Sequence, residues 1–392
     1  MKIRKISCYY LFLLFPFLFP ATIGGLPLIG TVIKGYKIIA GLIAIYYTLK
    51  KHIMSRLVLL LSCFYGVICI SALIHGLQID SFIIDVLFLW LIDYLTHDKK
   101  SFSIFLQVYV GFYSVLMLIN LATMVAFPNG LYASSAYNLN WFLGYKNVII
   151  RLLLPYLTLM LTKKIVTNPN KKLSRRETFL CLATFVSIIL SQSFNSIIGA
   201  VIFILILWRN KSKGQLGKYV ITKAFTAYCI TDFIMLKSNI LSLFQNLIVN
   251  ILKKNGSERA RLAIWDHTLE MISKSPVIGY GGITNEMYNF AFRISHPHNL
   301  LLYYLMLGGV VGIAILLIAM FCAEKAGMNL RSTKLIAINN LFIGMFCAYF
   351  SMGYMESLTG ATMMIPMLVI LYNLNTMGME GDDDESRLMH TI

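Results

Sequence analysis

Apolar stretches of roughly 20 residues recur along the whole chain, and they constrain its fold more than any other feature of the sequence. A helix of about 20 residues is long enough to cross the hydrocarbon core of a bilayer. Of the 392 residues, 58% are hydrophobic and only 13% are charged. A soluble domain of this length would need far more charge to cover its surface. The sequence therefore predicts an all-α polytopic integral membrane protein.

We expect about twelve transmembrane helices, each from one apolar interval. The predicted intervals are 8–24, 33–49, 57–75, 81–96, 103–127, 148–166, 178–193, 196–208, 219–236, 299–321, 335–354 and 360–376. The first interval is similar to a signal peptide, but no convincing small-residue cleavage site follows it, so we expect a retained helix. The turn SQSFN at 191–195 separates the seventh and eighth intervals. Merging these two would move every later basic segment to the outside of the membrane.

The positive charge of the chain, a net +17 at pH 7, lies in short clusters between the apolar intervals. The clusters occupy residues 2–5, 50–56, 99–100, 163–176, 209–218 and 325–334. An excess of Lys and Arg in the cytoplasmic loops fixes the orientation of a membrane protein during insertion. This distribution predicts that both termini are cytoplasmic. Orientation in the membrane therefore accounts for the basic charge, and we expect no nucleic acid as a partner.

The intervals divide the chain into four predicted parts. These are an N-terminal set of about nine transmembrane helices (1–236), a large extracytoplasmic loop (237–298), a C-terminal set of about three transmembrane helices (299–376) and a disordered acidic cytoplasmic tail (377–392). Apolar residues at helical spacing over 240–252 predict an amphipathic helix of the loop, lying on the membrane surface. A second helix is predicted from Ser257, a suitable N-cap, to Ile272, before Pro and Gly break it at 275–282.

The strongest local motif is His298-Asn299, which is followed after nine residues by Gly309 and then by Gly312. It begins where the chain leaves the large loop and enters the tenth interval. Glycines one turn apart allow a neighbouring helix to approach closely. A histidine at the mouth of a helix can accept a proton near neutral pH. An interfacial histidine without a chemical role would produce the same local pattern.

Together with a second motif, these residues resemble the O-antigen ligase and polysaccharide polymerase-like membrane glycosyltransferases. That family shows His-Asn, a nine-residue gap and Gly-x-x-Gly. Its long outer loop carries an Arg four residues before a Trp, and then a Pro-x-x-Gly-x-Gly turn. In this chain the residues of the second motif are Arg261, Trp265, Pro276, Gly279 and Gly281. The resemblance covers 258–313 and, beyond this segment, chiefly the topology.

One arginine of the family has no counterpart at the expected place. The family often carries an external arginine near the equivalent of 191–195, and this segment contains none. Arg151, just inside the sixth interval, is a candidate substitute. The residues before it, Gly144 to Asn147, resemble the corresponding segment of polymerases of Gram-positive capsule and exopolysaccharide systems, in which a Gly-x-x-Asn turn enters this helix.

The resemblance implies a donor oligosaccharide on undecaprenyl diphosphate, presented at the outer face of the bacterial cytoplasmic membrane. Arginine binds phosphate oxygens through a planar fork of donors. The first candidate for this role is Arg261, and the helpers are Arg151, Arg259 and Arg293. His298 would deprotonate the acceptor hydroxyl, and direct attack at the anomeric carbon would invert its configuration. This scheme needs no metal ion or other cofactor, and the outer loops contain no DxD motif.

Three functions remain open. A polymerase that joins repeat units into a capsule, exopolysaccharide or O-antigen would use the lipid-linked oligosaccharide as donor and acceptor, with a chain-length regulator and a flippase as possible partners. A ligase would use the same chemistry on another acceptor. A transporter or flippase of lipid-linked sugars would place charged residues through several spans. The residues available for that role are Lys37, Asp85, Asp93, Lys223 and Asp232. Most of them lie near interval ends, where side chains can reach the headgroups, so we favour the polymerase.

Overall fold

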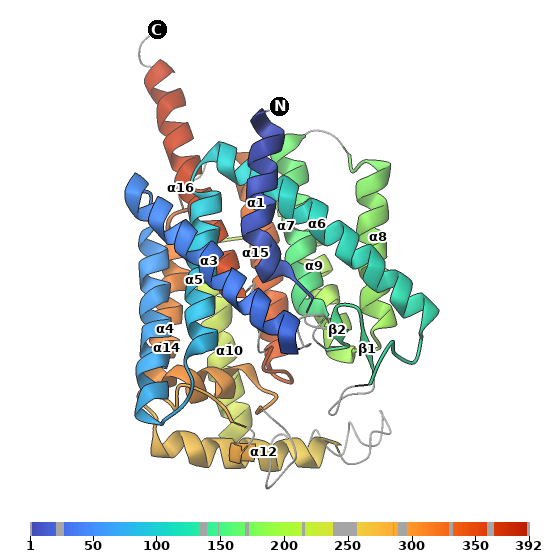
Figure 1. The fold of residues 1–392 in the computed structure, drawn as a ribbon. Coiled ribbons are helices and arrows are strands. Elements are labelled where there is room, and N and C mark those ends of the chain that lie inside the picture. The colour runs from blue at the N-terminus through green and yellow to red at the C-terminus, as the bar shows by residue number, and fades with distance from the viewer. Residues whose placement is uncertain are drawn as a thin grey trace.

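The computed structural model describes residues 2–20, 27–133, 139–147, 149–168, 172–213, 216–237, 257–284, 286–288, 296–328, 332–358 and 364–389. Over these residues the protein is a bundle of α-helices with one short β-hairpin (Figure 1). The predicted all-α membrane architecture is confirmed.

Each of the twelve predicted intervals is occupied by a helix of the described residues. These helices are α1 (Lys2–Leu18), α3 (Pro27–Lys51), α4 (Arg56–Ile74), α5 (Asp80–Thr96), α6 (Lys99–Ala126), α7 (Ile150–Thr167), α8 (Arg175–Leu190), α9 (Phe194–Lys213), α10 (Val220–Lys237), α14 (Leu300–Lys325), α15 (Thr333–Gly353) and α16 (Met364–Met389). Within the described ranges, α3, α4, α6, α14 and α15 are long and apolar enough to cross a membrane. The number of twelve spans therefore stays a prediction.

Polar residues determine where several helices begin. The Ser55 hydroxyl accepts a hydrogen bond from Val58 N at the start of α4. The Asp98 carboxylate accepts bonds from two backbone N–H groups at the start of α6. Ser174 and Glu177 form a capping box at the start of α8. Each contact satisfies backbone donors that the first turn of a helix leaves without an intrahelical partner.

The predicted turn at 191–195 is confirmed, because α8 ends at Leu190 and α9 begins at Phe194. Gln192 has a φ of 54°, in the left-handed region, and this residue reverses the direction of the chain. The Ser191 hydroxyl donates to a carbonyl of the last turn of α8 at 2.6 Å. Two separate helices therefore occupy this stretch, and the basic segments that follow keep their predicted end of the bundle.

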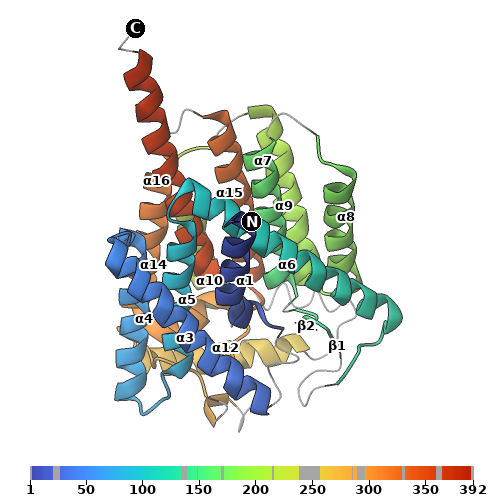
Figure 2. The same ribbon diagram turned by 45° about the horizontal axis from the view of Figure 1, so that its top comes forward.

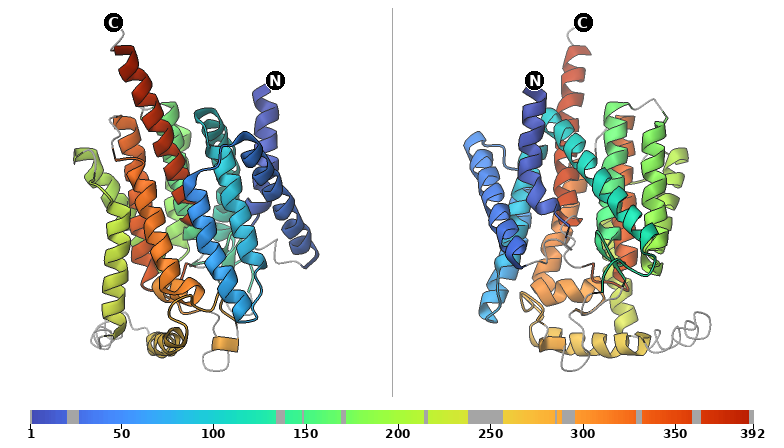
Figure 3. Two further views of the ribbon diagram at one scale, coloured as in Figure 1. Left: turned by 90° about the vertical axis from the view of Figure 1, so that its left-hand side faces the viewer. Right: turned by 45° about the vertical axis from the view of Figure 1, so that its right-hand side comes forward.

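Both termini and the helix ends beside the basic clusters lie at one end of the bundle, which we call the terminal end (Figures 1 and 2). The opposite end, the loop end, is crossed by α12 (Ser257–Lys274), which lies crosswise to the bundle (Figure 3). This placement agrees with the predicted topology, in which the large loop and the termini are on opposite sides. Which side of the membrane each end faces stays a prediction.

Helix α12 confirms the second predicted helix of the large loop. Its buried residues Ile264 and Trp265 form an apolar cluster with Leu302 and Met306 of α14. The charged residues on its other face are exposed. This amphipathic division holds α12 against the end of the bundle. The other predicted helix of the loop, over 240–252, lies outside the described residues.

Helix α16 continues to Met389 in the described residues, and the predicted separation of a tail at residue 377 stays a prediction. One expectation about charged residues is wrong. Asp93 and Asp232 are buried rather than directed to the headgroups. Asp93 accepts hydrogen bonds from Ser55 N at 3.0 Å and from Asn373 Nδ2 at 2.9 Å, and so connects α4, α5 and α16.

Candidate active site

Helix α14 is interrupted at Gly309, whose φ of 59° and ψ of −158° are not helical. The loop segment after α12 binds to this break. Four hydrogen bonds run from Tyr280 N to Met306 O (2.6 Å), from Gly281 N to Leu307 O (2.9 Å), from Val310 N to Pro276 O (3.0 Å) and from Val311 N to Val277 O (3.1 Å). They replace two bonds that an unbroken helix would make across this position. Irregular backbone is tolerated at membrane depth only where protein satisfies its polar groups, as it does here.

Three glycines make this docking possible, namely Gly279, Gly281 and Gly309. Each has a positive φ, and a Cβ on any of them would lie within 2.6 Å of a backbone atom of another segment. Gly312 is different, because its Cβ would lie at an ordinary 3.4 Å from the Phe64 ring. The predicted close approach at these motifs is therefore an approach of the turn to α14 and α4, rather than of one helix to another.

Asn299 forms the N-cap of α14 and is fully buried. Its side-chain oxygen accepts a hydrogen bond from Leu302 N at 2.9 Å. Its amide nitrogen donates to both carboxylate oxygens of Asp232 in α10, at 3.0 and 2.9 Å. The Asn of the His-Asn motif therefore fixes the start of α14 against α10, and with it the position of the preceding residue, His298.

The His298 side chain contacts a carboxylate that lies far away in the sequence. Its Nδ1 is 3.4 Å from Oε2 of Glu356, which follows α15 and is buried. The other carboxylate oxygen accepts a bond of 2.6 Å from Asn147 Nδ2. The loop before His298 is held by Trp265, whose Nε1 donates to Pro297 O at 2.8 Å. His298 itself has a φ of 52°, a conformation that an L-residue keeps only where its surroundings impose it.

Asn147 reaches Glu356 because a hairpin precedes α7. The strands β1 (Asn140–Trp141) and β2 (Gly144–Tyr145) pair antiparallel. The fully buried Trp141 donates from Nε1 to Phe127 O at 2.8 Å, and Leu143 N donates to Asn120 Oδ1 at 2.8 Å. These bonds fix the hairpin against the end of α6. The Gly-x-x-Asn turn noted in the sequence is the second strand of this hairpin and its exit.

A second histidine of the loop, His296, is neutral. Its Nδ1 accepts hydrogen bonds from His298 N at 3.2 Å and from the Ser357 hydroxyl at 3.0 Å, so this nitrogen carries no proton. Burial lowers the pKa of His296 to about 4, and the charges of His298, Arg151 and Arg261 act in the same direction. His296 therefore acts as a hydrogen-bond acceptor that holds the backbone of His298 in place.

Glu356 is ionised. Burial raises the pKa of its carboxyl group, but the hydrogen bond to His298 and the electrostatic interactions with His298 and Arg261 outweigh burial, so the pKa is lowered from its usual value. Arg151, in the first turn of α7, also interacts electrostatically with Glu356. The structure thus brings Arg151, Arg261 and His298 together around one carboxylate, from three separate parts of the sequence. We call these four residues the loop-end cluster.

The remaining predicted arginines cannot be placed in the cluster. The side chain of Arg259 and the whole of Arg293 lie outside the described residues. Arg261 additionally directs Nη1 to the Met355 sulfur at 3.6 Å. Among the described residues, no group of three or more His, Cys, Asp and Glu side chains is arranged to hold a metal ion.

The comparison with protein families supports the sequence resemblance. Residues 179–317 match the family model described as O-Antigen ligase. The resemblance read from the motifs is thereby confirmed, and the match supports a membrane enzyme that transfers glycans. No curated protein matches the chain significantly. The segment that matches this family model contains Asp232, Arg261 and His298, whereas Arg151 and Glu356 lie outside it.

Sequence reasoning missed Glu356 and the contact of Asn147 with it. One signal was present, since Glu356 is an acidic residue directly after a predicted span and near its outer end. An ionisable residue beside a span is a reason to expect a functional partner. The sequence does not show that this carboxylate meets His298, because 58 residues separate them.

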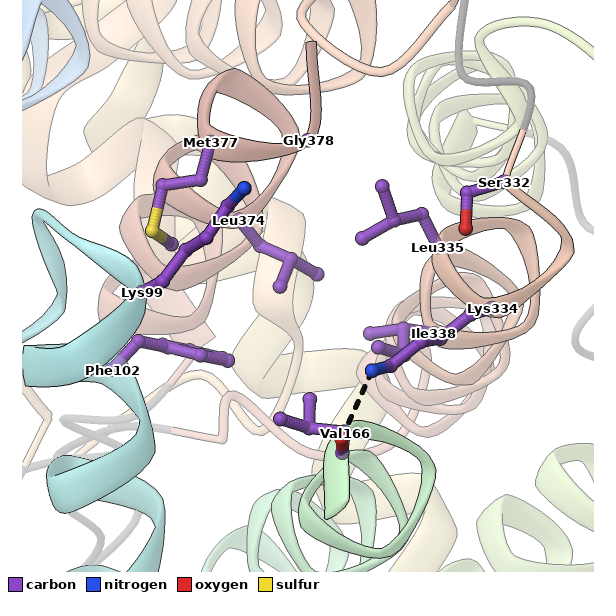
Figure 4. A pocket seen from close by; sticks show the side chains of 10 residues that line it. All are labelled: Lys99, Phe102, Val166, Ser332, Lys334, Leu335, Ile338, Leu374, Met377 and Gly378. Atoms are coloured by element: carbon purple, nitrogen blue, oxygen red, sulfur yellow. Dashed lines mark hydrogen bonds between the residues drawn. The ribbon is translucent and has the colours of Figure 1, made fainter. Parts of the chain in front are cut away.

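A cavity of about 420 Å³ lies between α6, α7, α15 and α16 at the terminal end (Figure 4). Lys99 and Lys334 line it together with apolar side chains such as Phe102 and Ile338. Lys334 Nζ donates to Val166 O at 2.9 Å, closing one side. Its lining contains neither a histidine nor a carboxylate. The loop-end cluster, which contains a histidine, a carboxylate and two arginines, is therefore the candidate active site.

Proposed function

We propose that the protein polymerises undecaprenyl-diphosphate-linked oligosaccharide repeat units at the outer face of the bacterial cytoplasmic membrane. The observation that carries the proposal is the convergence of Arg151, Arg261 and His298 at the loop end. The match of residues 179–317 to the O-antigen ligase family supports glycan transfer. In this arrangement the terminal end faces the cytoplasm, and the loop end receives substrate from the outer leaflet.

The two arginines bind the diphosphate of the donor, since guanidinium groups offer paired donors to phosphate oxygens. The acceptor hydroxyl attacks the anomeric carbon of the donor. A new carbon–oxygen bond forms while the bond to the diphosphate oxygen breaks, and the electron pair leaves with the diphosphate. His298 takes the proton of the hydroxyl. Attack opposite to the leaving group inverts the anomeric configuration.

Transfer to an acceptor other than a second repeat unit, as in a ligase, would use the same residues. The transporter alternative is less well supported. Asp93 and Asp232, two of the charged residues that a transport path would need, each accept hydrogen bonds from an asparagine side chain of another helix. These carboxylates hold helices together. Arg151, Arg261 and His298 lie together at the loop end, which favours a reaction at the membrane surface over the passage of a substrate through the bundle.

The first test replaces Arg151, Arg261 and His298 individually by Ala in the host cell. Lys274→Ala is the matched control, because Lys274 is an exposed cation on the same helix as Arg261 and its Nζ lies 2.8 Å from Oε1 of its neighbour Glu270. Each of the three variants should reach the membrane, lose long polymer and accumulate lipid-linked single repeats. Polymer of normal length in all three would contradict the proposal.

A second test separates the three functions with purified protein in liposomes. A polymerase should convert undecaprenyl-diphosphate-linked repeat unit, supplied as the only substrate, to longer lipid-linked chains. Product that forms only after a different acceptor is added would identify a ligase. Movement of the substrate between leaflets without any new glycosidic bond would identify a transporter.

A further inference from the structure

We propose that Glu356 is the positioning residue of His298: it binds the Nδ1 side of the ring and leaves Nε2 free to take the acceptor proton. This inference rests on the proposed function, in which His298 is the base. Glu356 lies outside the segment that matches the O-antigen ligase family, so the match assigns it no role.

The first argument is the orientation of the carboxylate. Asn147 holds one oxygen of Glu356 at 2.6 Å, and the other oxygen faces His298 Nδ1 at 3.4 Å. A buried carboxylate that is fixed on one oxygen has a defined direction for the other. The contact to His298 is long for a hydrogen bond, but such bonds in a site without substrate are often long and tighten in the reactive complex.

The second argument is the tautomer. An ionised carboxylate only accepts hydrogen bonds, so the His298 nitrogen that faces it carries the proton. In the neutral ring the lone pair then belongs to Nε2, which is the atom a base needs. After proton transfer, the carboxylate stabilises the imidazolium that forms. The same division of roles between carboxylate and imidazole operates in hydrolase triads.

The third argument is that the neighbouring groups do not replace Glu356. His296 is neutral and its Nδ1 already accepts two hydrogen bonds. Arg151 and Arg261 carry the wrong charge to accept a proton from the ring. Asp232 is engaged on both oxygens by Asn299. Glu356 is therefore the carboxylate of the described residues that faces His298.

The competing role for Glu356 is that of a counterion that only balances the charges of Arg151 and Arg261 until the diphosphate binds. The two roles predict different kinetics. A counterion acts on the donor, so its loss changes the KM for the donor. A positioning residue acts on the base, so its loss lowers kcat and moves the acidic limb of the rate–pH profile to lower pH, because the imidazolium is no longer stabilised.

The experiment measures polymerisation by the purified full chain in liposomes, with undecaprenyl-diphosphate-linked repeat unit as the probe. Glu356→Gln should lower kcat by at least about 100-fold, the usual scale of general-base catalysis, with the donor KM unchanged. The matched control is Glu270→Gln, since Glu270 is an exposed glutamate on α12. Asn147→Ala keeps the carboxylate but frees one oxygen, so it should lower kcat by a smaller factor and give the same direction of the pH shift.

The outcomes distinguish this inference from the proposed function. If His298→Ala is inactive while Glu356→Gln keeps the kcat and pH profile of the parent protein, the positioning role is refuted and the base survives. If His298→Ala is fully active, the proposed base itself is wrong. A raised donor KM in Glu356→Gln with unchanged kcat identifies a counterion. Should Glu356→Gln fail to fold, the Asn147→Ala profile decides, and an unchanged profile overturns the inference.

Discussion

Acidification should destabilise the loop end of the protein, because His296 is buried there as a neutral imidazole. The pKa of His296 is lowered from its usual value of 6.5 to about 4, first by burial and then by the nearby charge of His298. The unfolded chain binds a proton below pH 6.5, whereas the folded protein binds it only near pH 4. Titration of His296 therefore leaves the free energy of unfolding unchanged above pH 6.5 and lowers it as the pH falls from 6.5 to about 4.

The difference between the two pKa values corresponds to a loss of about 3 kcal/mol in the free energy of unfolding once the loss is complete. Roughly 2–3 kcal/mol of this should be lost by about pH 4.5. Glu356 does not confuse the measurement, because its pKa is lowered from 4.5 and its own contribution is lost only at still lower pH. The control is His296→Asn, whose amide oxygen can accept the bonds from Ser357 and His298 N but does not titrate.

The assay is the midpoint of thermal unfolding in detergent at several values between about pH 7.5 and about pH 4.5. The midpoint of the parent protein should fall with decreasing pH by more than that of His296→Asn. Above pH 6.5, the usual pKa of histidine, the two curves of midpoint against pH should have the same slope. Parallel curves over the whole range would refute the reasoning, because they would mean that His296 contributes no proton linkage.

Three further outcomes follow from the same contacts. Gly281→Ala should abolish the folded protein in a detergent-extraction assay, since its Cβ would lie 2.0 Å from a backbone nitrogen of α4, whereas Gly312→Ala should be extracted like the parent. Trp265→Phe removes the bond to the loop carbonyl before His298, and should lower stability by about 1 kcal/mol and reduce kcat. A cysteine in place of exposed Asp266 should react with a membrane-impermeant maleimide added outside the cell, whereas one in place of Lys100 should not; the reverse pattern would invert the proposed topology.

Much of the fold was predictable because it depends on local composition. Each predicted apolar interval is occupied by a helix, and Ser257 is a suitable N-cap at the position where α12 begins. The role of Gly309 was not predictable in the same way. A glycine that lets a helix pack closely and a glycine at a left-handed break look alike in an apolar sequence. The four hydrogen bonds to the Pro276 turn decide between them.

The candidate site was predictable only in part. Arg261 and His298 were found because they lie in motifs, and Arg151 because a charge at the start of an apolar interval is costly without a purpose. The partnership of Glu356 with Asn147 and His298 depends on how α7, α14 and α15 pack. Packing between helices is set by side chains along their whole length, and no local pattern in the sequence records it.

The loop-end cluster combines residues that lie at the ends of α7, α12, α14 and α15. His298 and Arg261 belong to α14 and α12, where the Asn299–Asp232 contact and the turn at Gly309 hold the start of α14 on both sides. Arg151 and Glu356 belong to α7 and to the end of α15, which are tied by the bond of 2.9 Å from the Tyr349 hydroxyl to Arg151 O. In the proposed mechanism, phosphate binding uses Arg261 together with Arg151, and proton transfer uses His298 together with Glu356. The proposed site is therefore completed by two residues, Arg151 and Glu356, that lie outside the segment matching the family model.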